Sequence, residues 1–97
     1  MQKELKLQMN ELTGYQKEAA VNAIEEMSEL TKVLAKMLRF GLTDETGKPR
    51  SDLEEELGDV CLMMDLIHKH FDIDPASTEE RKQDKRDKLG VWSSLYG

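Results

Sequence analysis

Two pairs of carboxylates fall inside the apolar stripes of two long helical segments, and this placement constrains the fold more than any other feature. Glu26 and Glu29 lie three residues apart in the first segment, and Glu56 and Asp59 have the same spacing in the second. Residues at i and i+3 share one face of an α-helix. Each helix therefore presents one carboxylate pair in a single direction.

The apolar neighbours of these carboxylates indicate that both pairs face the interior of the fold. At about 100° per residue, Val33 lies within about a quarter turn of Glu26, and Val60 lies beside Glu56. An unpaired ionised carboxylate in such a place is unfavourable, so it must be protonated or bound to a cation. Four converging carboxylates are hard to neutralise by protonation alone. The pattern favours a hard divalent cation such as Mg²⁺, with Mn²⁺ as a substitute.

A solvated helix face is the alternative explanation for each pair. Charged residues make up 35% of the chain, and acidic pairs at i and i+3 are common on exposed helices. A single pair would be explained in that way. Two pairs, each within an apolar arc on helices joined by a loop, favour a metal site.

The rest of the pattern predicts an all-α fold in one domain over residues 1–97, a helical bundle of four or so helices. Apolar residues recur every three or four positions, and turn residues separate the segments. The metal-binding pair is expected over about 15–40 and 51–71, and a charged helix with a tail over 77–97. A further short helix is expected over 1–12.

The ends of these helices are predicted from capping residues. Thr13 is the expected N-cap of the segment 15–40, and Gly41 is expected to end it. Ser51 and Ser77 each open a sequence that matches a capping box, so the last two helices are expected to begin there. Gly90 is expected to end the last helix after Leu89.

The apolar surface of the segment 15–40 exceeds what so short a chain can cover. Its apolar residues span a broad arc, and 97 residues bury only a modest core. The sequence therefore predicts a homo-oligomer, either a dimer or a dimer of dimers, in which subunits complete the helical bundle.

Composition excludes several classes of protein. The net charge is −6, with 14 basic and 20 acidic residues, which argues against non-specific binding to nucleic acid. No apolar run reaches membrane-spanning length, and the chain does not open on a signal-peptide pattern. These features predict a cytoplasmic protein with neither a membrane nor a nucleic-acid partner.

The two acidic motifs resemble those of the MazG-like, all-α nucleoside triphosphate pyrophosphohydrolases. Glu26-x-x-Glu29 followed by Glu56-x-x-Asp59 carries the likeness, together with "YQKEA", "IEEMSEL" and "LEEELGDV" around the motifs. The resemblance covers about residues 15–67, with a weaker echo in "KRDKLGVW". One set of motifs makes the chain similar to the short, single-domain members.

The resemblance implies a helical oligomer that hydrolyses nucleoside triphosphates to monophosphate and pyrophosphate with Mg²⁺. It implies that Glu26, Glu29, Glu56 and Asp59 ligate the metal, and it places Glu25 in the family's acidic motif, so Glu25 and Glu26 are the catalytic candidates. A phosphoribosyl-ATP pyrophosphatase-like activity and a non-catalytic helical interaction module are the alternatives.

Polar residues elsewhere are the candidates for contact with the nucleoside triphosphate. The basic residues of the final helix match the family's phosphate-contacting segment, and the long helix offers one further cation and two residues for base recognition. The substrate-binding candidates are Lys36, Lys85, Arg86, Lys88, Gln16 and Asn22.

Overall fold

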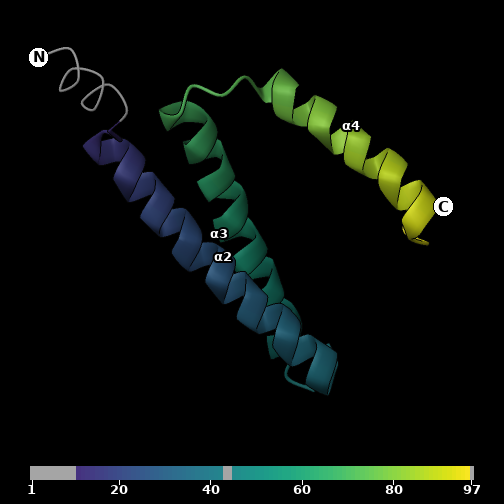
Figure 1. Ribbon diagram of the computed structural model, residues 1–97. Helices are drawn as coiled ribbons and strands as arrows, with labels where there is room; N and C mark the ends of the chain where they lie inside the picture. Colours follow the sequence, from purple (N-terminus) through teal and green to yellow (C-terminus); the bar gives the residue numbers. More distant parts are fainter. Residues whose placement is uncertain (1–10, 43–44, 97) are drawn as a thin grey trace, which may run out of the picture.

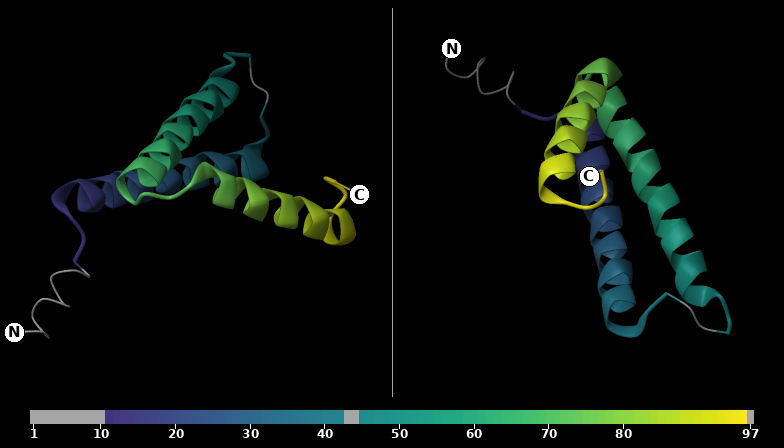
Figure 2. Two further views of the ribbon diagram at one scale, coloured as in Figure 1. Left: turned by 90° about the horizontal axis from the view of Figure 1, so that it is seen from above. Right: turned by 90° about the vertical axis from the view of Figure 1, so that its right-hand side faces the viewer.

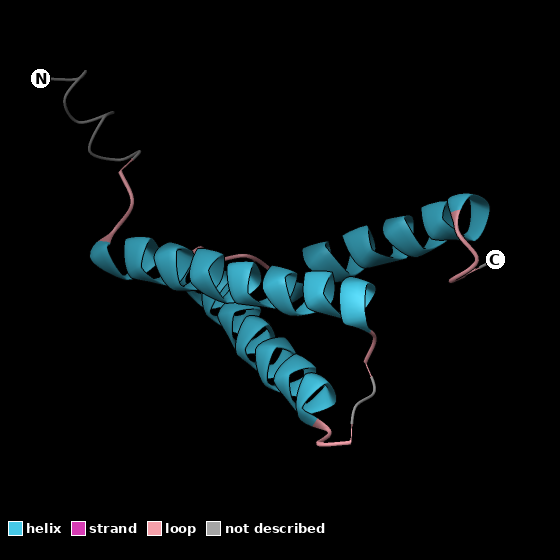
Figure 3. Cartoon of the chain, turned by 90° about the horizontal axis from the view of Figure 1, so that it is seen from below, coloured by secondary structure: helices cyan, strands magenta, loops and turns pink. Residues whose placement is uncertain are grey.

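The computed structural model describes residues 11–42 and 45–96, and these ranges contain helices and connecting turns with no strand (Figure 3). The helices are α2 (Gly14–Phe40), α3 (Lys48–His70) and α4 (Pro75–Trp92) (Figure 1). The predicted all-α class is confirmed. The helix expected over 1–12 lies mostly outside the described residues, and Glu11 and Leu12 are not helical.

Helix α2 begins and ends where the sequence predicts. The Thr13 hydroxyl accepts a hydrogen bond from the Gln16 backbone N–H, and the Gln16 side chain accepts one from the Thr13 N–H. This capping box satisfies two donors at the helix start. Gly41 ends the helix with φ 83°, a conformation that glycine adopts without strain, and its N–H donates to the Met37 carbonyl.

Helix α3 begins at Lys48 and not at Ser51, so the capping box predicted at Ser51 is wrong. Gly47 is the N-cap in a left-handed conformation, and Pro49 lies in the first turn, where its missing N–H costs nothing. The Ser51 N–H donates to the Gly47 carbonyl at 3.1 Å, which places Ser51 inside the helix. Pro49, which falls between the two predicted helices, therefore lies in the first turn of α3.

Helix α4 shows the same kind of difference at both ends. Asp74 is the N-cap, its carboxylate accepting from the Ala76 N–H at 2.9 Å, and Pro75 is the first helical residue. The capping box predicted at Ser77 is therefore wrong. The helix also runs through Gly90 to Trp92, so Gly90 does not end it.

Helices α2 and α3 form an antiparallel hairpin (Figure 2). The two helices lie close together where α2 begins and α3 ends, which we call the closed end, and they diverge towards the loop that joins them, which we call the open end. At the closed end, Ala19 and Ala23 are the buried apolar residues, and small side chains let two helices approach closely. The Gln16 amide donates to the His70 carbonyl at 2.9 Å, and the Tyr15 ring stacks on His70 with centroids 5.8 Å apart. These contacts tie the start of α2 to the end of α3.

Helix α4 leaves this hairpin after residues 71–74 and lies apart from it (Figures 1 and 2). One link joins its first turn to α3, where the His68 ring lies 2.8 Å from the Thr78 hydroxyl. The radius of gyration is 18.2 Å, against about 13 Å for a compact chain of about 100 residues. The described chain is therefore an extended shape with large faces open to solvent.

Candidate metal-binding site

Three of the four predicted carboxylates meet between α2 and α3. Glu26 from α2 and Glu56 and Asp59 from α3 place carboxylate oxygens within 4.8 Å of one another. We call these three residues the carboxylate cluster. The helical register explains the meeting, since Glu56 and Asp59 share one face of α3 and that face turns towards α2. The arrangement offers several hard oxygen ligands to one cation.

The electrostatics of the carboxylate cluster oppose ionisation. Partial burial is the largest cause that raises the pKa of Glu26, and the charge of Asp59 and a hydrogen bond with it raise the pKa further. Partial burial also raises the pKa of Glu56, and the charges of Glu26 and Asp59 add to the effect. Both pKa values therefore lie above the ordinary value, because partial burial and the neighbouring negative charges each disfavour the ionised form.

One oxygen of the carboxylate cluster lacks any hydrogen bond. Glu56 Oε2 is buried and has no partner among the described residues. Buried polar atoms are almost always paired, and an unpaired carboxylate oxygen is costly. An orphaned acceptor beside two further carboxylates is the arrangement that a bound cation would satisfy. The donor set therefore fits a hard divalent metal.

Glu29, the fourth predicted ligand, lies beside the carboxylate cluster but is outside it. Its carboxylate pairs with Lys32 at 3.2 Å on an exposed part of α2. It is still close enough for its charge to raise the pKa of both Glu26 and Glu56. An exposed ion pair of this type is weak, so the Glu29 side chain can rotate away from Lys32 at little cost.

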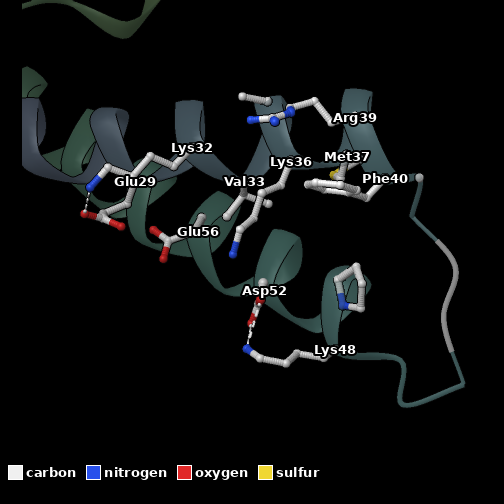
Figure 4. Close-up of a pocket in the computed structure, with 13 residues that line it drawn as sticks. Glu29, Lys32, Val33, Lys36, Met37, Arg39, Phe40, Lys48, Asp52 and Glu56 are labelled. Atoms are coloured by element: carbon white, nitrogen blue, oxygen red, sulfur yellow. Dashed lines mark hydrogen bonds and ion pairs between the residues drawn. The ribbon is translucent and has the colours of Figure 1, made fainter.

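A cavity of about 770 Å³ opens next to the carboxylate cluster, at the open end of the hairpin. Glu29 and Glu56 line one end of it, and Lys36 projects from α2 towards α3 (Figure 4). Phe40 and Met37 lie further towards the loop. Of the predicted substrate-binding residues, Lys36 is the one that lines this cavity.

The other α2 candidates occupy different surroundings. Gln16 lies at the closed end of the hairpin, where both ends of its amide are used in the contacts with Thr13 and His70. Asn22 and Glu25 are exposed on α2 within one turn of Glu26. Glu25 contributes to the raised pKa of Glu26 through its charge.

The basic candidates on α4 lie away from the carboxylate cluster within this chain. Arg86 pairs with Glu79 of its own helix at 3.2 Å, and Lys85 and Lys88 are exposed. Helix α4 as a whole lies apart from the hairpin (Figure 1). Their assignment to substrate binding stays a prediction.

The sequence interpretation missed several residues of the cavity. Arg39 and Phe40 were not among the predicted site residues, yet both line the cavity. Lys48 and Pro49 were assigned to a loop, and the first turn of α3 carries them into the cavity wall. The available signal was an aromatic residue next to a cation at the end of a long helix.

Comparisons of the chain with family models, with curated proteins and with solved structures found no match. Among the described residues, no helix carries an apolar stretch long enough to cross a membrane.

Proposed function

We propose that the chain hydrolyses nucleoside or deoxynucleoside triphosphates to monophosphate and pyrophosphate in a Mg²⁺-dependent reaction, as its motif resemblance to MazG-like pyrophosphohydrolases implies. The carboxylate cluster carries this proposal, because three carboxylates from two helices meet there with Glu56 Oε2 unpaired. Mn²⁺ is expected to substitute, since both ions accept carboxylate oxygen ligands.

The metal would be held by Glu26, Glu56 and Asp59, with Glu29 available after release of Lys32. When bound, Mg²⁺ supplies positive charge to phosphate oxygens and makes water more acidic. The chain's own contribution is to fix these ligands on two packed helices. Helical positions hold side chains more precisely than loop positions do.

The residues of the chain that would move protons and balance charge lie on α2. Glu25 is exposed and lies next to Glu26 outside the carboxylate cluster, so it is the proposed acceptor of a proton from water, and Glu26 is the second catalytic candidate. Lys36 lies in the adjacent cavity, where its ammonium group would offset the charge of the departing pyrophosphate.

A second copy of the chain is the proposed partner. Large apolar side chains remain exposed along one side of α2, including Ile24, Leu34 and Leu38, which is 90% exposed. A contiguous apolar face of this kind marks an interface. Association of two or more copies would cover it and would complete the helical bundle, which supports the predicted dimer or dimer of dimers.

The test is an assay of pyrophosphate release from a panel of nucleoside triphosphates and from phosphoribosyl-ATP, with Mg²⁺, with Mn²⁺ and with excess chelator. We expect metal-dependent release that is lost in Glu56→Gln. Turnover of phosphoribosyl-ATP alone would identify the alternative activity. Absence of hydrolysis with every substrate and metal would favour the helical interaction module.

A further inference from the structure

The cavity between α2 and α3 changes in chemical character along its length. Its inner end borders the carboxylate cluster through Glu56, and Lys36 lies midway (Figure 4). Its outer end, beside the loop, is formed by Met37, Phe40 and Pro49. Anionic ligands, a cation and an apolar surface therefore follow one another in a single cavity.

We propose that this cavity holds the whole nucleotide, with the nucleobase stacked on Phe40 and the triphosphate extending past Lys36 to the carboxylate cluster. This inference rests on the proposed function and adds to it the orientation of the substrate and the way its base is recognised.

Phe40 is suited to stacking. It is the last residue of α2 and is 74% exposed, so a ring face is open to a ligand. The Arg39 guanidinium lies 5.3 Å from the Phe40 ring centroid, which adds a cation next to the stacking surface. Aromatic side chains bind bases of any sequence in this way, because every base has a π face.

The charges of the cavity favour an anion. Four cationic side chains and three carboxylates line it, although the whole chain carries a net charge of −6. Lys32 and Lys48 are paired with Glu29 and Asp52. Neither Lys36 nor Arg39 forms an ion pair within the described residues, so Lys36 is available to phosphate, while Arg39 lies against the Phe40 ring at the outer end.

The length of the cavity matches an extended nucleotide. Glu29 and Phe40 both line it and are eleven residues apart on α2, which corresponds to about 16 Å along the helix axis. A nucleotide carries its phosphates at one end and its base at the other, so it would contact both ends of the cavity. An inorganic polyphosphate would use the inner end alone.

The wall of the cavity also predicts weak discrimination between bases. Its described lining includes no side-chain amide, hydroxyl or imidazole, which are the neutral groups that read base edges by hydrogen bonding. Both oxygens of the Asp52 carboxylate accept from Lys48 at 3.1 Å. Sites that select strongly between similar substrates depend on such placed polar groups. Stacking on Phe40 would accept purines and pyrimidines alike.

The experiment measures binding by calorimetry in the presence of Mg²⁺, with two probes: α,β-methylene-ATP, which resists cleavage, and inorganic tripolyphosphate. The variants are Phe40→Ala, Phe40→Tyr, and Trp92→Ala as a control that removes a similarly exposed aromatic ring, on α4, outside the cavity. We expect Phe40→Ala to weaken nucleotide binding about fivefold or more and to leave tripolyphosphate binding unchanged. Phe40→Tyr keeps the ring and should bind as the wild type does.

Equal nucleotide affinity in Phe40→Ala and Trp92→Ala would overturn the inference. So would a change in sedimentation of Phe40→Ala with equal loss of both probes, since the ring would then serve a subunit contact. Phe40-dependent binding without pyrophosphate release would keep this site and refute the proposed hydrolysis. Pyrophosphate release that Phe40→Ala leaves unchanged would support the proposed hydrolysis and refute the stacking site at Phe40.

Discussion

Acidic residues have opposite electrostatic surroundings in the hairpin of α2 and α3 and in the separate helix α4. In the hairpin, Glu26 and Glu56 lie among other carboxylates, and the pKa of each is raised. In α4, the hydrogen bond from Arg86 is the largest cause that lowers the pKa of Glu79, and the charge of Lys82 adds to it. Glutamate side chains thus have negatively charged neighbours in the hairpin and cationic neighbours in α4.

The difference shows which acidic residues are open to a ligand. Helix α4 balances its charges internally, through Arg81 with Asp84 and through Glu79 with Lys82 and Arg86. Glu79 and Asp84 therefore already have cationic partners within their own helix. The carboxylate cluster of the hairpin has no such partner among the described residues, so a metal would relieve its repulsion.

The largest expected effect comes from removing one charge of the carboxylate cluster. We expect Glu56→Gln or Asp59→Asn to lower pyrophosphate release at least about a hundredfold, because metal-assisted charge stabilisation contributes several kcal/mol. Glu29→Gln is expected to lower pyrophosphate release in the same way if Glu29 also ligates the metal. The measurement is steady-state release of pyrophosphate, with circular dichroism as the check on helical content.

Glu79→Gln in α4 is the matched control, since it removes one carboxylate from a region where cations already neutralise it. Its activity should equal that of the wild type. Full activity in Glu56→Gln and Asp59→Asn would remove the assignment of the carboxylate cluster as the metal site.

The second expected effect is stabilisation by metal. A ligand that binds the folded chain at a hundred times its Kd adds about 2.7 kcal/mol. In a domain of this size, that corresponds to a rise in Tm of about 10 °C or more. Thermal unfolding with chelator and with Mg²⁺ should show the rise in the wild type and in Glu79→Gln. A rise of equal size in Glu56→Gln would place the metal elsewhere.

The sequence predicted the parts of this structure that depend on periodic pattern. The positions of α2 and most of α3 follow from helical spacing. The convergence of Glu26, Glu56 and Asp59 was predicted from that spacing together with their apolar neighbours. The position of Glu29 outside the carboxylate cluster was not predictable, because the Glu29 carboxylate can either ligate a shared metal or pair with Lys32.

The helix starts were mispredicted for a local reason. Ser51 and Ser77 match capping boxes, but a proline stands just before each of them in the chain, at Pro49 and Pro75. Proline is favoured in the first turn, so each helix begins about one turn earlier. The cavity could not be predicted, since it depends on how widely the two helices open towards the loop.

A third expected effect is that the two regions respond to pH with opposite sign in the absence of metal. The raised pKa of Glu56 means that its contribution to stability is present below the ordinary value of 4.5 and is lost as pH rises through the raised pKa. The lowered pKa of Glu79 means that its contribution is present above 4.5 and is lost as pH falls through the lowered pKa.

Urea unfolding with chelator tests this. At neutral pH, Glu56→Gln should be at least as stable as the wild type, and Glu79→Gln should be less stable. At acid pH, both differences should shrink, because the wild-type carboxyls are then protonated. A Glu56→Gln variant that is less stable than the wild type at neutral pH would contradict the repulsion inferred for the carboxylate cluster.

The smallest expected effects concern the cations of α4, which the family resemblance assigns to phosphate and which this chain holds apart from the carboxylate cluster. Lys85 and Lys88 are neighbours at i and i+3 and are exposed, while Arg86 pairs with Glu79. If α4 stays apart from every carboxylate cluster of the assembled protein, changing each to Gln should alter kcat/KM by less than about twofold, because an exposed charge far from a site contributes little. Arg86→Gln should differ in stability alone, by about 0–1 kcal/mol.

Lys36→Gln is the contrasting variant, since a charge-assisted contact with phosphate is worth about 1.5–3 kcal/mol, or roughly ten- to a hundredfold in kcat/KM. A tenfold loss in Lys85→Gln or Lys88→Gln would show that α4 meets a carboxylate cluster in the assembled protein, and the contrast between the two regions would then hold for one chain and not for the oligomer.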